Sequence, residues 1–208
     1  MYRPASFVET DLAALDALIE RDNFITLITV RDGVPTVNHL PVLYHRDGDS
    51  VRLRGHWARP NPQARHAGPA TVVVHGPHAY VSPSWYPDKE AEARVPTWNY
   101  AVAHLAGTLE TFDDEASLAA LVDDLSHQHE ARVGRDWRFE YGRDDHRSQL
   151  RGIIGFRFHV DTASLKFKLN QNHPVANRLA VAGQLETQQR EDSRDIAALM
   201  RARTPQET

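Results

Sequence analysis

Hydrophobic residues recur along this chain with two different periods, one typical of helices and one typical of strands. Near the start, Thr10 and Asp11 favour a helix N-terminus, and apolar residues follow at helical spacing: Leu12, Leu15, Leu18 and Ile19. A second helix is predicted after Asp113 or Asp114, with one apolar face: Leu118, Leu121, Val122 and Leu125. Two shorter helices are predicted over residues 175–185 and 193–203.

Most other apolar segments are short, rich in β-branched residues and bounded by turn signals, which predicts strands. Asp32-Gly33 and Asp47-Gly48 predict tight turns, and Gly76-Pro77 predicts a bend or a break in a strand. The predicted strands cover residues 24–30, 34–44, 51–57, 70–75, 79–82, 98–112, 152–160 and 165–169. Because these strands do not alternate with helices, we expect a mainly β fold with flanking helices, built on a closed or nearly closed antiparallel barrel.

Composition narrows the function classes. The chain has 208 residues, a formal net charge of -4 and no cysteine. The negative net charge excludes a generally basic surface for nucleic acid, but it does not exclude a local basic patch. The absence of cysteine excludes disulfides and thiolate chemistry. No apolar run approaches the roughly 18 residues of a membrane span, and the N-terminus lacks a signal-peptide layout, so we expect a cytoplasmic protein with no membrane partner. The sequence contains no dinucleotide-binding, P-loop or nucleophile-elbow motif.

The third predicted strand carries the first candidate site. Alternation places Arg52, Arg54 and His56 on one face and Leu53 and Trp57 on the other. The turn that follows offers Asn61, Gln63 and Arg65 at a helix start, where backbone N–H groups favour a phosphate. A solvated edge strand with an ordinary turn explains the same residues. Next to Gly55, His56 could contact a ring system or bind a metal, or it could be a hydrogen-bonded strand histidine.

Two aromatic segments flank a charged loop over residues 88–94. The first runs from Tyr80 to Pro87 and contains Ser82, Ser84 and Trp85, and the second runs from Val95 to Tyr100 and contains Trp98 and Asn99. Proline stiffens both segments, while the aromatic rings and hydroxyl groups suit a planar heteroaromatic ligand or a subunit interface. A rigid loop that closes one end of the barrel is the alternative.

A third polar stretch follows the last predicted strand. Lys166 and Lys168 share one strand face, and the amides of Asn170, Gln171 and Asn172 precede a helix start. The stretch could complete an anion site, but on residue types alone a polar strand end and a turn is the favoured interpretation.

Together these motifs resemble the PaiB family. The specific strings are Ser82-Pro83-Ser84-Trp85-Tyr86-Pro87 and Pro96-Thr97-Trp98-Asn99-Tyr100, supported by Arg54-Gly55-His56 with Arg59 and Asn61 and by Lys166-Phe167-Lys168-Leu169 with Gln171. The resemblance covers about residues 1–185, leaving residues 186–208 as a helical tail. Trp57, Pro60 and Asn170 stand where the family commonly has a smaller apolar residue, alanine and serine.

The resemblance implies a split β-barrel of the FMN-binding type, a homodimer with the cofactor at the subunit interface, and a role as a negative transcriptional regulator that binds DNA. The cofactor-binding residues it implies are Arg54, His56, Arg59, Asn61, Ser82, Ser84, Trp85, Trp98, Asn99, Lys168 and Gln171. It assigns no catalytic residue and no metal.

Two alternatives on the same fold remain. One is a heme b protein similar to the piperazate synthases, an oxidoreductase or synthase with His56 as the axial ligand. The other is an FMN-dependent oxidoreductase. Whether the chain is an enzyme stays open at this point.

Overall fold

The structure is a computed structural model that describes residues 1–204, and the chain divides into two compact units. Unit 1 comprises Met1–Leu18, His75–Ala103 and Ser164–Thr208, and unit 2 comprises Ile19–Val74 and His104–Ala163. The predicted tail, residues 186–208, falls in unit 1, and its last four residues lie outside the described part of the chain. A separate tail after residue 185 therefore stays a prediction.

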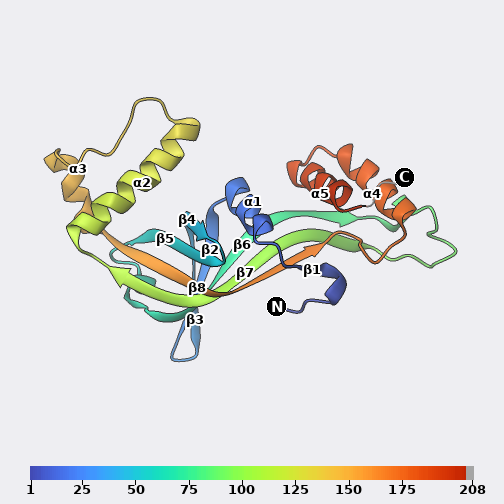
Figure 1. The fold of residues 1–208 in the computed structure, drawn as a ribbon, viewed down its shortest axis with the longest axis horizontal. Helices are drawn as coiled ribbons and strands as arrows, with labels where there is room; N and C mark the ends of the chain where they lie inside the picture. The colour runs from blue at the N-terminus through green and yellow to red at the C-terminus, as the bar shows by residue number, and fades with distance from the viewer. Residues whose placement is uncertain (205–208) are drawn as a thin grey trace. The chain divides into compact units, whose positions relative to one another are not determined.

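The strands form one sheet in the order β3-β2-β6-β7-β8-β5-β4, with short β1 added on β8. The strands are β1 (Val8–Glu9), β2 (Phe24–Arg31), β3 (Val34–Pro41), β4 (Leu43–Asp47), β5 (Ser50–Ala58), β6 (Gly68–Val81), β7 (Thr97–Phe112) and β8 (Ile153–Lys168). The strands β6, β7 and β8 are the long strands of the sheet (Figure 1), and each contributes one segment to unit 1 and one to unit 2. The strand path is open within residues 1–204, because the end strands β3 and β4 are not paired with each other. The mainly β fold is confirmed, whereas full closure of the barrel is not.

Both predicted hairpin turns form, because their residues can adopt the left-handed backbone angles that the turns require. Asp32 and Gly33 have φ angles of 53° and 77°, which is the double left-handed conformation of a type I′ turn between β2 and β3. Gly48 has a φ of 57° in the turn that joins β4 to β5. Glycine and aspartate adopt these angles at low cost, so the turns fix the register of both strand pairs.

In unit 2 the buried face of the sheet contains a polar network around Gln63. This side chain is fully buried at the start of the 3₁₀ turn η2 (Pro62–Arg65). Its Oε1 accepts from Trp57 Nε1 at 3.0 Å and from Asn38 Nδ2 at 2.8 Å, while its Nε2 donates to the carbonyl oxygens of Leu27 and Thr36. The network joins β2, β3 and β5 to η2.

Replacing Gln63 with leucine should destabilise the fold by about 2 kcal/mol, because the N–H donors of buried Trp57 and half-buried Asn38 lose their acceptor. Thermal and urea unfolding measure the loss. Gln189→Leu, at an exposed position, is the matched control and should leave the unfolding midpoint unchanged. Equal midpoints for Gln63→Leu and the control would contradict the importance of the network.

The helix α2 (Glu115–Val133) follows β7 directly, and α3 (Asp144–Gln149) leads through η4 (Leu150–Gly152) into β8 (Figure 1). Asp114 caps α2, since its Oδ1 accepts the backbone N–H of Ser117 at 2.9 Å. A local core anchors this end of unit 2, and its residues are Leu118, Ala119, Phe139 and Leu150, with Phe112, Val122 and Ile153 packed against them. This core holds α2 near the ends of β7 and β8.

Unit 1 packs its helices on its own segments of β6, β7 and β8. Its helices are α4 (Val175–Glu186) and α5 (Glu191–Ala202), together with the η1 turn (Ala5–Phe7), the η3 turn (Pro83–Trp85) and most of α1 (Ala13–Arg21). The helices α4 and α5 lie side by side (Figure 1). They bury an apolar set of side chains: Val181, Leu185, Ile196, Ala197 and Met200. No helix within residues 1–204 has both the length and the apolar composition of a membrane span.

The structure corrects three expected strand boundaries. The strand predicted over 34–44 is divided into β3 and β4 at Val42, whose backbone N–H and C=O bond to Asn23 instead of a neighbouring strand. Conversely, β6 runs unbroken through Gly76-Pro77. A Cβ on Gly76 would lie 2.7 Å from both Ala101 O and Leu18 Cδ2, so the close packing at this point requires glycine. This glycine permits close packing and does not break the strand. Strand β8 is also continuous where the sequence predicts two strands.

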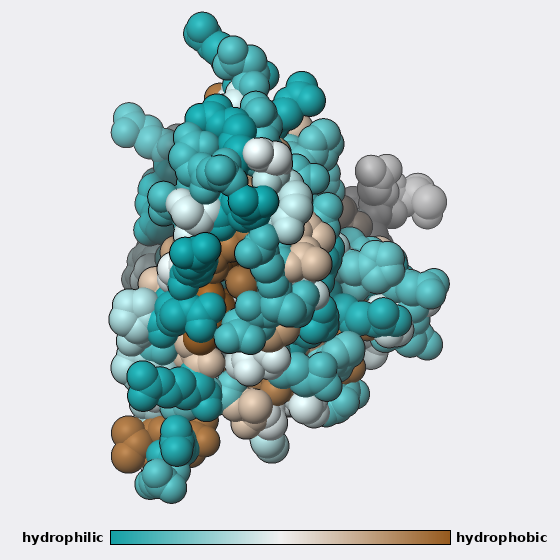
Figure 2. Space-filling view, turned by 90° about the vertical axis from the view of Figure 1, so that its left-hand side faces the viewer, coloured by the Kyte–Doolittle hydropathy of each residue, from teal (hydrophilic) through white to brown (hydrophobic). Residues whose placement is uncertain are grey.

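The short helix α3 is missing from the sequence prediction, because its sequence Asp-Asp-His-Arg-Ser-Gln has no apolar period. On the side of the molecule shown in Figure 2, hydrophilic residues predominate and hydrophobic residues show as a few separate areas. A ligand that binds on this side would therefore meet mainly polar groups.

Candidate functional site

The candidate site of unit 2 lies on the outer face of three neighbouring strands, β4, β5 and β8. Along β5, Leu53, Gly55 and Trp57 are buried, and the alternate residues Arg52, Arg54 and His56 face outward, as the alternation predicts. Strand pairing then aligns two rows of side chains across the three strands: His45, Arg52 and His159 in one, and Leu43, Arg54 and Arg157 in the other. We call Arg52, Arg54 and Arg157, with His45 and His159, the arginine face.

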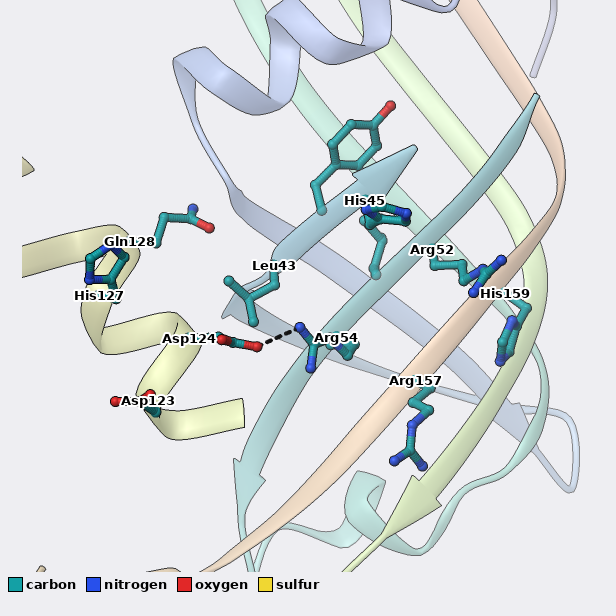
Figure 3. Close-up of a pocket in the computed structure, with 12 residues that line it drawn as sticks. Leu43, His45, Arg52, Arg54, Asp123, Asp124, His127, Gln128, Arg157 and His159 are labelled. Atoms are coloured by element: carbon teal, nitrogen blue, oxygen red, sulfur yellow. Dashed lines mark hydrogen bonds and ion pairs between the residues drawn. The ribbon is translucent and has the colours of Figure 1, made fainter. Parts of the chain in front are cut away.

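Helix α2 faces these strands and lines one side of an open cavity of about 940 Å³ (Figure 3). Its contribution is polar: Asp123, Asp124, His127 and Gln128. Asp124 Oδ2 accepts from a guanidinium nitrogen of Arg54 at 2.7 Å, which is the ion pair drawn in Figure 3. Both side chains are about half exposed, so water weakens this ion pair, and a stronger anion can compete for Arg54.

Arg54 and Arg157 stand directly opposite each other on β5 and β8, and like charges in this position repel. Each arginine is compensated separately. Arg54 pairs with Asp124, while the guanidinium of Arg157 lies 4.1 Å from the ring centre of Phe112 and donates to Ser117 Oγ at 3.4 Å. The repulsion between them persists, so a doubly charged anion between them would be stabilised.

The histidines of the cavity do not form a metal site. His45, His127 and His159 line it, but within residues 1–204 no group of three or more histidine and acidic side chains is placed to hold a metal ion. His159 Nε2 instead lies 3.8 Å from Glu110 Oε2. The chemistry that the cavity favours is binding of an anion by guanidinium groups.

The structure places the four predicted site residues of unit 2 in different surroundings. Only Arg54 lines the large cavity. Arg59 donates to the carbonyl oxygens of Arg151 at 2.7 Å and of Ile153 at 3.1 Å and forms an ion pair with Asp113. These bonds join the end of β5 to the start of β8.

Asn61 is the N-cap of η2. Its Oδ1 accepts the backbone N–H of Gln63 at 2.9 Å, and its Nδ2 donates to Asn38 Oδ1 at 2.8 Å. Both polar atoms of its side chain are thus used within the fold. Its role in binding a cofactor stays a prediction, as does that of Arg59.

His56 continues the outer face of β5 by one more row, opposite Gly155 of β8. Burial lowers the pKa of His56, so its imidazole is neutral at pH 7, and its buried Nδ1 has no hydrogen-bond partner. The neighbouring Gly55 points inward, where a Cβ would lie 2.6 Å from Phe156 Cζ. The glycine therefore accommodates a core ring and not a ligand. Trp57 is also on the inner face, so its bulk lies away from His56.

The other seven predicted site residues belong to unit 1. Ser82 and Ser84 bond to each other through their hydroxyl groups at 2.7 Å, and Ser82 caps η3. Trp98 is 47% exposed, while Asn99 is buried with an unpaired Oδ1 and a contact from its Nδ2 to Met200 sulfur.

The remaining three are Trp85, Lys168 and Gln171. Trp85 is half-buried next to buried Tyr86. Lys168 Nζ donates to Thr97 Oγ1 and to the carbonyl oxygen of Trp98, and Gln171 bonds to the backbone of Phe167 and Leu169. The structure thus brings Lys168 to the start of β7, at Trp98.

Sequence reasoning missed Arg157, His45 and Asp124 as members of the site. Arg157 and Arg54 are far apart in sequence and meet only because β5 pairs with β8. The residues around Asp124 predict a solvated helix face, whereas Asp124 forms an ion pair with Arg54 across the cavity. One signal was available: Arg157 and His159 repeat the alternating basic pattern of Arg52, Arg54 and His56.

In unit 1 the loop between η3 and β7 is held by a carboxylate network. Asp88 accepts from Arg94 Nε at 3.0 Å and from a second guanidinium nitrogen at 2.5 Å, and Asn177 Nδ2 donates to it at 2.7 Å. The hydrogen bonds from Arg94 lower the pKa of Asp88 to about 2. The ionised carboxylate therefore ties the loop to α4.

Asp88→Asn should lower the melting temperature at neutral pH, because it removes the charge that Arg94 binds. The pKa of Asp88 is lowered from its ordinary value of 3.8 to about 2 on folding, so its stabilising effect is present above pH 4 and is lost as the pH falls to 2. The melting-temperature difference between variant and wild type should shrink over that interval, as followed by circular dichroism. A difference that does not vary with pH would contradict this, and Asp49→Asn, at an exposed turn, is the control.

Comparison with known proteins defines the structural class to which this protein belongs. The open, mostly antiparallel sheet with its flanking helices is a split β-barrel. Two solved structures share the fold: the FAD and heme binding protein from Mycobacterium smegmatis (TM-score 0.58, 22% identity, 77% of this chain and 73% of that chain) and the flavocytochrome Anf3 from Azotobacter vinelandii (TM-score 0.57, 18% identity, 80% and 72%).

The chain belongs to the family described as "Putative FMN-binding domain", which matches residues 1–162. It is 29% identical over 203 residues to the protease synthase and sporulation protein PAI 2 of Bacillus subtilis (strain 168), with 96% of each protein covered. The predicted membership of the PaiB family is therefore confirmed, and FMN is the cofactor that the family description carries.

Proposed function

We propose that this protein binds FMN and that the arginine face of unit 2 holds the phosphate. The observation that carries the proposal is that the pairing of β5 with β8 places Arg52, Arg54 and Arg157 on one face of the sheet. All three side chains line the cavity of about 940 Å³. The planar guanidinium group of arginine donates two parallel hydrogen bonds to phosphate oxygens and stays charged at any physiological pH. The family description supplies the identity of the ligand.

The donor set fits the group. A flavin phosphate is dianionic near neutral pH, and three guanidinium groups face two carboxylates, those of Asp123 and Asp124, in the cavity. Arg54 would exchange its ion pair with Asp124 for the phosphate, and Arg52 and Arg157 would add further charge-assisted hydrogen bonds. FMN would supply redox chemistry of its isoalloxazine ring when bound. The contribution of this chain is to bind and orient the cofactor.

The absorbance spectrum of the purified protein tests the ligand class. After incubation with FMN and removal of free flavin, we expect retained flavin absorbance at about one equivalent per chain. A colourless protein would contradict the proposal. A Soret band in protein purified without added cofactor would favour heme.

Heme with His56 as axial ligand is the second candidate, favoured by one observation. The imidazole of His56 is neutral at pH 7, as iron ligation requires, and its Nδ1 has no partner. However, a ligating histidine normally donates its second ring N–H to a carbonyl or carboxylate, and such a partner is missing at Nδ1. A Soret band that stays unchanged in His56→Ala would reject His56 as the ligand.

We further propose that the protein is a homodimer with the cofactor at the subunit interface. In unit 1, Tyr80 and Trp98 are 46% and 47% exposed, with ring centres 5.9 Å apart, and His78 lies against Trp98. Exposed aromatic residues grouped on one surface are typical of an interface core. Sedimentation should give a dimer for wild type and a shift toward monomer for Trp98→Ser. A wild-type monomer would reject the proposal.

The proposed biological role is negative regulation of transcription, with FMN as the responsive ligand. It is supported by similarity to the sporulation protein of Bacillus subtilis and by the arginine face, which is a local basic patch on an acidic chain. Binding to labelled genomic DNA fragments in low salt tests it. Retention of specific fragments supports the role, and the absence of any retained fragment contradicts it. Turnover of reduced nicotinamide by the FMN-loaded protein would favour an oxidoreductase instead.

A further inference from the structure

Unit 1 contains its own polar cavity, which shares no lining residue with the cavity at the arginine face of unit 2. Its volume is about 410 Å³, within the range of pockets for small organic ligands. Its apolar lining residues are Phe7, Ala93, Val95 and Pro96, and the polar lining includes Lys168 and His173. We call it the Lys168 cavity.

The lysine of this cavity lacks a counter-charge. Lys168 Nζ donates to two neutral oxygens, Thr97 Oγ1 and the carbonyl of Trp98. Lys166, two residues away on the same face of β8, is 7% exposed and donates to the carbonyl of Tyr2 at 3.1 Å, with its ammonium 5.2 Å from the ring centre of Tyr100. Within residues 1–204, no carboxylate lies at ion-pair distance from either lysine.

This arrangement has an electrostatic cost. Burial lowers the pKa of Lys168, and the charge of Lys166 adds to the effect. A bound anion at Lys168 would offset both contributions, because it supplies the missing opposite charge in a partly dehydrated position. An anionic ligand would therefore stabilise the cationic form of Lys168.

The other charged groups around the cavity do not supply the counter-charge that Lys168 lacks. Arg94 is occupied by Asp88, so this pair is close to neutral as a unit. Glu92 also lines the cavity, but its side chain is exposed and water screens it.

His173 gives a second, independent indication of a ligand. Its ring stacks on Tyr86 with centres 4.9 Å apart and planes 5° apart, which fixes its orientation. Its Nδ1 is buried and has no hydrogen-bond partner. A buried polar atom without a partner is unfavourable, and a ligand oxygen within the cavity would satisfy it.

We propose that the Lys168 cavity binds a small organic anion, a carboxylate or a phosphate ester with a short apolar body, with Lys168 as its counter-ion and His173 as a hydrogen-bond partner. The apolar lining residues suit the body of such a ligand, and Lys168 and His173 suit its oxyanion. The proposal concerns a ligand other than FMN and does not depend on the arginine face, because all the residues it uses belong to unit 1.

Lysine footprinting on the wild-type full chain tests it directly, because the sequence has three lysines, Lys89, Lys166 and Lys168. The protein is acetylated under limiting reagent and each lysine is quantified by mass spectrometry. The probes are phenyl phosphate and benzoate, which share an apolar body and differ in the anionic group. Benzyl alcohol serves as the neutral control, and exposed Lys89 is the internal reference.

At ten times its Kd, the better anion should slow acetylation of Lys168 about tenfold and leave Lys89 unchanged. The probe that protects at the lower concentration identifies the preferred anionic group. Three results would each overturn the proposal: no protection by either anion, equal protection by benzyl alcohol, or protection by FMN alone. FMN retention measured by absorbance in the same samples reports separately on the proposed flavin site.

A variant pair gives a second readout. Lys168→Gln keeps an amide that can donate to Trp98 O but removes the charge, and it should weaken binding of the better probe at least about tenfold by calorimetry. Lys89→Gln should leave binding unchanged. Equal affinities of the two variants would contradict the assignment, and if Lys168→Gln does not fold, the footprint on wild type decides.

Discussion

Gly107→Ala should destabilise the protein severely. A Cβ on Gly107 of β7 would lie 2.0 Å from the carbonyl oxygen of His159 in β8. Backbone atoms of a paired strand cannot move away as a flexible side chain can, so β7 and β8 would have to separate locally. We expect a loss of about 3 kcal/mol or more, which corresponds to a fall in melting temperature of about 6–12 °C.

The matched control is Gly183→Ala in helix α4, where a Cβ would meet no atom within 4 Å. Alanine favours a helix over glycine, so this change should leave stability unchanged or raise it by up to about 1 kcal/mol. Thermal unfolding of both variants separates them. If Gly107→Ala melts with the wild type, the close approach of β8 to Gly107 is wrong, and with it the position of His159 on the arginine face.

The second large effect concerns the ion pair in the cavity, where the two partners should change FMN affinity in opposite directions. Arg54→Met removes a charge-assisted donor to the phosphate and should weaken FMN binding by about 10- to 100-fold. Asp124→Asn removes the competitor that occupies Arg54 and should tighten binding by about two- to fivefold, as expected for an exposed ion pair.

Fluorescence titration with FMN measures both constants. Asp123→Asn is the control for the lost negative charge, because Asp123 lines the same cavity without bonding to Arg54. It should have a smaller effect than Asp124→Asn. Weaker binding by Asp124→Asn would show that Asp124 supports the ligand and does not compete with it.

Local patterns predict most of the fold. The Asp32-Gly33 turn, the alternation along β5 and the apolar face of α2 each depend on neighbours in sequence, and each is found as expected. The errors arise from contacts between distant residues. The break at Val42 depends on bonds to Asn23, and Gly76 depends on contact with Ala101, and neither contact can be inferred from the adjacent residues.

The candidate site is less predictable, because long-range pairing builds it. The basic face of β5 is visible in the sequence, but Arg157 joins it through the pairing of β5 with β8, and Asp124 joins it through the packing of α2. Residue types are also misleading in one place. Gly55 suggests a ligand beside His56, whereas its missing side chain makes space for Phe156.

The measurement that tests the central claim most directly compares FMN with riboflavin, which lacks the phosphate, in wild type and in Arg157→Gln. If the arginine face holds the phosphate, wild type should bind FMN at least about tenfold more tightly than riboflavin, and most of this preference should disappear in the variant, while riboflavin affinity stays the same. Equal affinities of the two flavins in wild type, or a preference that the variant retains in full, would contradict the account.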